Sequence, residues 1–119
     1  MSKRTDREFL SDILEAIRRI KAYTAGMAYE AFLQDTKTQD AVVRNLEIIG
    51  EAVKNPPEEI REKHEAVPWR GMAGIRDRLI HHYFGVSLDV VWEIVTAELD
   101  AVGSHVEQIL AKMDAKQSD

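Results

Sequence analysis

Residues 69–85 carry most of the side chains in this sequence that could do chemistry. They include Arg76 and His81, which are separated by four residues, with Asp77 directly after the arginine and Tyr83 near the end. A histidine can transfer protons near neutral pH, and an arginine guanidinium can bind phosphate through its planar fork. On a helix, a carboxylate four residues before a histidine can orient the imidazole and raise its pKa. The combination is compatible with acid–base chemistry at a phosphate.

Arg76 is expected to lie on the apolar side of a helix. At ~100° per residue, one arc of the helix holds Met72, Ile75, Leu79, Ile80 and Tyr83, with Arg76 in its middle. A guanidinium there is unfavourable unless it meets a carboxylate, an anion or a partner surface. Two interpretations follow: a buried ion pair with an acidic residue such as Glu51, or an anion site aimed at phosphate.

The spacing of Arg76 and His81 has a consequence for assembly. On a regular helix the two side chains point ~140° apart. They converge if the helix ends near His81, or if two copies of the helix face each other. Gly85 is suited to the position just after a helix end, which would lie near Tyr83. We therefore predict a homodimer with the two motif helices at its interface.

The motif Arg-Asp-Arg-Leu-Ile-His-His-Tyr at residues 76–83 resembles that of the HEPN ribonucleases, an arginine and a polar residue followed by a histidine. The added tyrosine is similar to the HepT toxin branch of that superfamily, which is paired with a minimal nucleotidyltransferase antitoxin. The resemblance covers roughly residues 6–113. Further segments similar to that branch are residues 38–41, 46–52, 67–70 and 91–95.

The resemblance implies a metal-independent endoribonuclease toxin that a nucleotidyltransferase antitoxin neutralises. RNA supplies its own nucleophile, the 2′-OH, so the protein need only transfer protons and stabilise charge. We expect His81 to be the acid–base group, Arg76 to stabilise the phosphate, and Asp77 to support them. In the HepT branch the antitoxin attaches AMP to the tyrosine, which is Tyr83 here. Arg70 and Arg78 are further candidate phosphate contacts, and we expect neither a metal nor a cofactor.

Composition limits the other possibilities. The 119 residues fit one domain, residues 1–119 with a polar tail at 114–119, and the 45% apolar and 31% charged residues are typical of globular proteins. There is no cysteine, and no apolar run long enough to span a membrane, so we expect a soluble cytoplasmic protein. The net charge of −5 argues against a broad basic surface, so RNA contacts should be local.

A second function class stays open. The chain could be a helical interaction module that binds a nucleotidyltransferase and cleaves nothing. Its acidic net charge and the apolar setting of Arg76 favour that alternative.

Helical periodicity dominates the chain, and no strand-like alternation of convincing length appears. We predict an all-α bundle of four principal helices with short helical segments. Trp69 and Trp92 are expected to be core or interface anchors. The first helix should open at Thr5 and end near 24–26, and a short helical piece should cover 29–33. The second helix should run from 36 to the prolines at 56–57, and a brief helix should follow it and reach about His64. The motif helix should follow Pro68, and the last helix should begin at Ser87.

Overall fold

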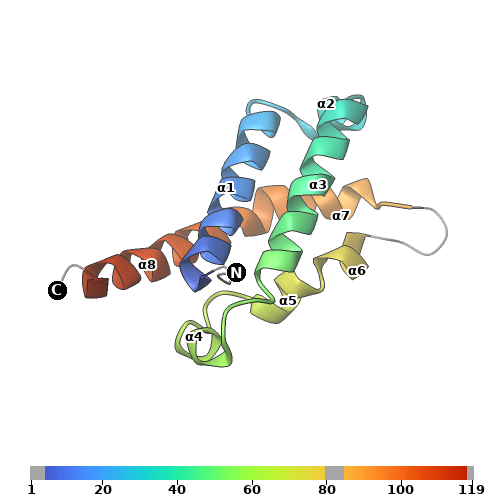
Figure 1. Ribbon diagram of the computed structural model, residues 1–119. Helices are drawn as coiled ribbons and strands as arrows, with labels where there is room; N and C mark the ends of the chain where they lie inside the picture. The colour runs from blue at the N-terminus through green and yellow to red at the C-terminus, as the bar shows by residue number, and fades with distance from the viewer. Residues whose placement is uncertain (1–4, 80–84, 118–119) are drawn as a thin grey trace.

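The computed structural model describes residues 5–79 and 85–117, and all regular structure within those ranges is helical (Figure 1). In chain order the elements are α1 (Asp6–Thr24), α2 (Tyr29–Leu33), α3 (Thr36–Ala52), α4 (Glu58–Lys63), α5 (Trp69–Ala73), α6 (Ile75–Leu79), α7 (Leu88–Glu93), the π-helical η1 (Ile94–Glu98) and α8 (Leu99–Gln117). The predicted all-α fold is confirmed. Within the same ranges, no helix is long and apolar enough to cross a membrane.

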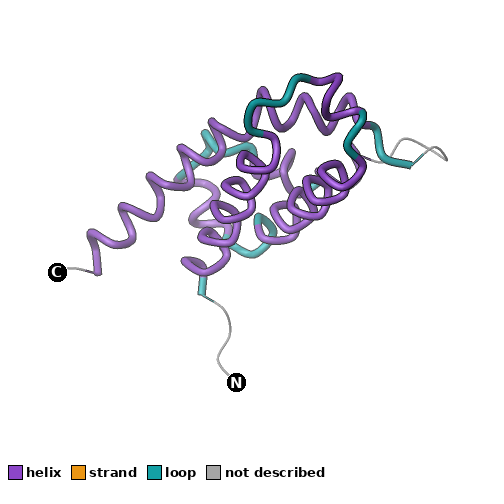
Figure 2. Tube along the Cα trace, turned by 90° about the horizontal axis from the view of Figure 1, so that it is seen from above, coloured by secondary structure: helices purple, strands orange, loops and turns teal. Residues whose placement is uncertain are grey.

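The helices form a bundle in which α1 packs against both α3 and α8. Elements α7, η1 and α8 make one continuous helical run that crosses α1 and α3 (Figure 1). The C-terminal part of α8 extends past the other helices, as Figure 2 also shows. The short elements α5 and α6 pack on α3, so the segment that holds the motif lies against the bundle rather than inside it.

Helix starts follow the local sequence signals. Thr5 and Glu8 form the predicted capping box, in which the Glu8 backbone N–H donates to Thr5 Oγ1 at 3.1 Å and the Thr5 N–H donates to Glu8 Oε1 at 3.2 Å. Ser87 caps α7 as predicted, accepting a hydrogen bond from the Val90 N–H. The second helix begins at Thr36, where it was expected, and the side chain of Asp35 caps it.

The core consists of apolar side chains from the long helices, and both tryptophans pack against it. Trp69 is 8% exposed and donates from Nε1 to the His64 carbonyl at 3.0 Å. Trp92 packs against Phe32 and Tyr29 with tilted rings, whose centroids lie 5.0 and 5.9 Å from that of Trp92. Most of the fully buried large side chains lie on α1, α3 and the α7–η1–α8 run: Leu10, Ile13, Ile20, Val42, Leu46, Ile49, Ile94 and Leu99.

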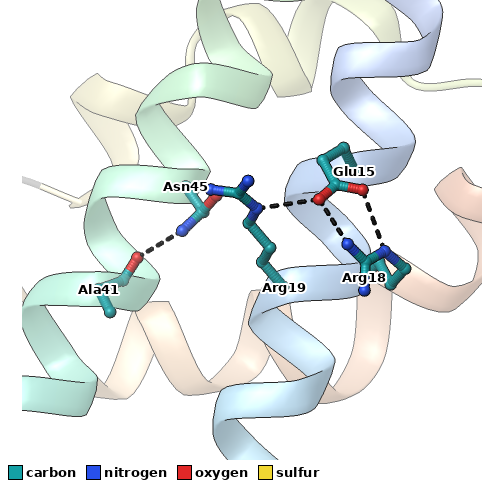
Figure 3. A network of polar contacts seen from close by, with 5 residues as sticks. All are labelled: Glu15, Arg18, Arg19, Ala41 and Asn45. Atoms are coloured by element: carbon teal, nitrogen blue, oxygen red, sulfur yellow. Dashed lines mark hydrogen bonds and ion pairs between the residues drawn. The ribbon is translucent and has the colours of Figure 1, made fainter.

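Polar side chains on α1 and α3 form hydrogen bonds around this core. Figure 3 shows Glu15 of α1 receiving hydrogen bonds from Arg18 and Arg19, and these bonds hold the pKa of the Glu15 carboxyl below its usual value. On α3, Asn45 is a buried polar residue whose Nδ2 donates to the Ala41 carbonyl at 2.9 Å. The side-chain amide is thereby satisfied within its own helix.

The last helix departs from the regular α-helix that the sequence predicts. At η1 the Leu99 N–H bonds the Ile94 carbonyl five residues back, which is π-helical pairing. On a regular α-helix Ile94 and Leu99 would point ~140° apart, yet both are fully buried. The extra residue brings Leu99 into the core in place of Glu98, which a regular helix would bury beside Ile94. The regular helix that the sequence predicts therefore does not place Leu99 in the core beside Ile94.

Candidate active site

Residues 69–79, the part of the motif segment that the structure describes, form two short helices rather than the single helix predicted. Element α5 begins after Pro68 and ends at Gly74, whose N–H bonds the Arg70 carbonyl at 3.0 Å. Element α6 follows at once and carries Arg76, Asp77 and Arg78. Glycine disfavours a helix interior because it gives up the most backbone freedom there, so a break at this position is physically reasonable.

Element α6 is held against α3 by a close approach that requires glycine. Ile75 is fully buried and Leu79 is 2% exposed. A Cβ placed on Gly50 of α3 would lie 2.7 Å from Ile75 Cγ2 and 3.4 Å from the Met72 carbonyl oxygen. The bare backbone of Gly50 therefore provides the seat for α6. Sequence reasoning missed Gly50, because a lone glycine within a helix does not say which element approaches it.

Arg76 is exposed, so its predicted place on the apolar face is wrong. The buried side of α6 is centred between Ile75 and Leu79, and Arg76 lies ~80° from that centre. The buried pair with Glu51 is also wrong, because Glu51 is exposed and bonds Lys54 at 3.2 Å. In the part of the chain that the structure describes, the side chain of Arg76 makes no hydrogen bond or ion pair.

A cavity of about 450 Å³ opens beside Arg76 and Asp77, between α6, α1 and α3. The wall formed by α3 and the turn after it contributes both signs of charge: Arg44, Glu47, Glu51 and Lys54. Asp77 is exposed next to Arg76, as a supporting carboxylate would need to be. The cavity thus carries charges of both signs, among them the guanidinium groups of Arg76 and Arg44, and is not a broad basic surface.

Arg78 differs from Arg76 in being bound. Its Nη1 and Nη2 donate to Glu98 Oε1 and Oε2 at 3.0 and 2.6 Å, a bidentate pair between α6 and η1. These hydrogen bonds raise the pKa of the Arg78 guanidinium above its usual value. Arg70, the other candidate phosphate contact, is exposed on α5. The roles of both arginines toward RNA stay predictions.

Two predicted site residues, His81 and Tyr83, lie outside the described residues. The structure therefore brings together Arg76, Asp77 and the cavity, and it does not address their geometry relative to the histidine. Gly85, where the description resumes, has φ 79°, a left-handed conformation that suits the position after a helix end. Among the residues described, no group of three or more His, Cys, Asp or Glu side chains could hold a metal ion.

Comparison with known proteins relates this architecture to one family. The family described as "Ribonuclease HepT-like" matches residues 13–109. A Methanocaldococcus jannaschii protein named "Putative RNase" is 44% identical over 119 residues, covering 100% of this chain and 98% of its own. "Probable ribonuclease HepT" of Thermococcus cleftensis is 46% identical over 107 residues, covering 90% of this chain and 97% of its own. No solved structure matches.

The family match spans most of the chain, and both relatives are covered nearly end to end. The chain therefore belongs to the HepT-like ribonuclease family.

Proposed function

We propose that this protein is a metal-independent endoribonuclease toxin in which Arg76 and His81 cleave RNA. His81 takes the proton from the ribose 2′-OH, whose oxygen attacks the adjacent phosphorus. The bond from phosphorus to the 5′-oxygen breaks, and that oxygen leaves as a 5′-hydroxyl after receiving the proton that His81 took from the 2′-OH. The other product is a 2′,3′-cyclic phosphate. Arg76 stabilises the charge that develops on the phosphate, and Asp77 orients the pair.

The observation that carries the proposal is the contrast between two neighbouring arginines. Arg78 is paired with Glu98 through two hydrogen bonds, whereas Arg76 is exposed beside the cavity and its side chain has no partner within the described ranges. An unpaired guanidinium is available to a phosphate, and its planar fork matches two phosphate oxygens. Family membership supports ribonuclease chemistry for the same segment.

A homodimer is part of this proposal. Because Arg76 and His81 point ~140° apart on a regular helix, two facing copies would complete the site. The mixed charges of the cavity wall support this arrangement, since a surface with both signs can face its own copy across a two-fold axis. We expect sedimentation equilibrium at micromolar concentration to give a dimer. A monomer under those conditions would contradict a site shared between protomers.

Control by a nucleotidyltransferase antitoxin completes the proposal. The Tyr83 hydroxyl oxygen attacks the α-phosphorus of ATP, pyrophosphate leaves, and the hydroxyl proton is released. The attached AMP adds negative charge and bulk near Arg76, which excludes RNA. Mass spectrometry should find AMP on Tyr83 after incubation with the cognate enzyme and ATP. Tyr83→Phe should then cleave RNA and escape silencing. Full silencing of Tyr83→Phe would mean that the partner simply covers the site.

The test of catalysis uses purified protein and end-labelled RNA. Arg76→Ala and His81→Ala should each reduce the cleavage rate ~10²-fold or more, with unchanged circular dichroism. Arg18→Ala is the matched control, since Arg18 is an exposed arginine that lines a different groove, and its activity should equal the parent's. Cleavage should survive EDTA, because the proposed chemistry uses only protein groups.

The alternative function is a non-catalytic helical module that binds a nucleotidyltransferase. It predicts no RNA cleavage by the parent protein and retained partner binding by His81→Ala. Cleavage that His81→Ala abolishes would exclude it. If EDTA abolished cleavage, the protein would still be a ribonuclease, but the metal-independent mechanism would be wrong.

A further inference from the structure

We propose that Glu98 is a positioning residue for RNA cleavage, which acts through Arg78 to orient α6 and present Arg76 at the cavity. The inference rests on the proposed function, because it assigns a role within the same site. Neither residue needs to touch the substrate in this role.

Element α6 needs support from outside itself. Its described part, Ile75–Leu79, is separated from α5 by the break at Gly74, so α5 and α6 do not support each other as one continuous helix. Ile75 and Leu79 attach one side of it to the core. Apolar contacts are non-directional, so they hold α6 in place without fixing its rotation closely. A directional contact on another side is required for that.

The pair between Arg78 and Glu98 is such a contact. Two parallel hydrogen bonds fix the plane of the guanidinium as well as its distance from the carboxylate. The side chains are 35% and 28% exposed, compared with 57% and 76% for the Lys21–Asp100 pair between α1 and α8. The more buried pair is screened less by water and salt, so it constrains the helices more strongly.

Fixing Arg78 also fixes Arg76. The two are two residues apart, so on a helix their side chains point ~160° apart. With Arg78 bound to η1, Arg76 is directed to the opposite side of α6, where it lines the cavity formed with α3. A rotation of α6 that broke the Arg78–Glu98 pair would move Arg76 along the cavity wall.

The π turn brings Glu98 to the place where it can do this. By moving Leu99 into the core, η1 releases Glu98 to the rim of the bundle, facing α6. π turns within α-helices occur frequently at functional sites. The irregular backbone, the bidentate pair and the unpaired Arg76 thus form one connected arrangement.

The first measurement is steady-state cleavage by Glu98→Gln, which removes the charge and keeps the side-chain shape. We expect kcat to fall ~10-fold or more with KM within about 2-fold, since a displacement near 1 Å can reduce the rate ~10²-fold. Arg78→Ala should behave the same way, and the double variant Arg78→Ala/Glu98→Gln should lose no more than either single one. Asp100→Asn, which breaks the Lys21–Asp100 pair, should keep the parent's kcat.

Kinetics also separate this role from direct RNA binding by Arg78. If Arg78 holds phosphate, Arg78→Ala raises KM with kcat unchanged, and Glu98→Gln frees the arginine and lowers KM. That pattern would overturn the positioning role, and so would additive losses in the double variant.

The second measurement does not depend on activity. The Arg78 N–H bonds the Gly74 carbonyl at 3.2 Å, and its hydrogen exchange should be ~10-fold faster in Glu98→Gln while α3 amides are unchanged. Unchanged exchange at Arg78 would overturn the proposal whatever the activity. A parent protein that cleaves no RNA, or an Arg76→Ala variant that cleaves normally, would instead overturn the proposed function, so the two failures are distinguishable.

Discussion

The seat of α6 on α3 can be tested by adding a single methyl group at Gly50. In Gly50→Ala the new Cβ would lie 2.7 Å from Ile75 Cγ2. This methyl is bonded directly to the Cβ of a fully buried residue, and the Met72 carbonyl oxygen lies 3.4 Å from the new atom on the same side. Neither neighbour is the flexible end of a side chain, so α6 itself must shift.

The expected change in the free energy of unfolding of Gly50→Ala is the sum of two opposing effects. Overpacking a core by one methyl costs ~1–3 kcal/mol, while glycine to alanine within a helix stabilises by ~0.5–1 kcal/mol. We expect a net loss of about 1 kcal/mol in the free energy of unfolding. Gly103→Ala is the matched control, because its Cβ would meet Ile17 Cδ1 at 3.6 Å, an ordinary contact. In Gly103→Ala only the better helix propensity of alanine remains, and we expect the free energy of unfolding to rise by ~0.5–1 kcal/mol.

Urea denaturation of the parent and both variants measures this difference, as a midpoint that falls for Gly50→Ala and rises for Gly103→Ala with the slope unchanged. Ile75→Ala should also destabilise Gly50→Ala less than it destabilises the parent, because it removes the clashing methyl; we expect a coupling of about 1 kcal/mol. Gly50→Ala as stable as the parent, or more stable, would refute the close approach of α3 and α6.

Two further predictions concern the core and pH. Leu99→Ala should lower the free energy of unfolding by ~2–5 kcal/mol in urea denaturation, whereas the exposed Leu33→Ala should change it by less than ~0.5 kcal/mol. Partial burial and the charges of Lys112 and Lys63 lower the pKa of His64 in the folded state. The unfolded chain therefore binds this proton first, so stability is full above pH ~6.5 and falls as the pH drops below it. His64→Gln should flatten that part of the stability–pH curve, and an unchanged curve would assign the loss to other groups.

Local signals were enough to predict most helix boundaries. The capping box at Thr5, the N-cap Ser87 and Pro57 each act within a few residues, and α1, α7 and α4 begin directly after them. The second helix, α3, ends at Ala52, before the prolines to which it was expected to run. Apolar periodicity likewise predicted that Met72, Ile75 and Leu79 are buried. Such features depend on neighbours in sequence, which is why they can be read from the sequence.

Features that depend on distant residues could not be predicted in the same way. The partner of Arg78 is 20 residues away, on an element whose register a π turn changes. The exposure of Arg76 depends on the break at Gly74 and on where Gly50 seats the next turn. A regular helix was assumed for the motif, and that assumption placed Arg76 among the apolar side chains. The burial of Arg76 was thus predicted incorrectly, and the roles of residues 76–78 in a site stay predictions.

The π turn has a consequence for how this helix can change length. From Ile94 to Leu99 the chain holds one residue more than a regular helix needs to keep both side chains inward. Losing one residue there would therefore leave a helix of ordinary geometry, in which the buried side chains of α8 keep their orientation relative to α7. Losing one residue within α8 itself, after the π turn, would instead turn every later side chain by ~100° and take buried residues out of the core. The π turn is thus the place in this long helical run where the chain can become one residue shorter without a change of core.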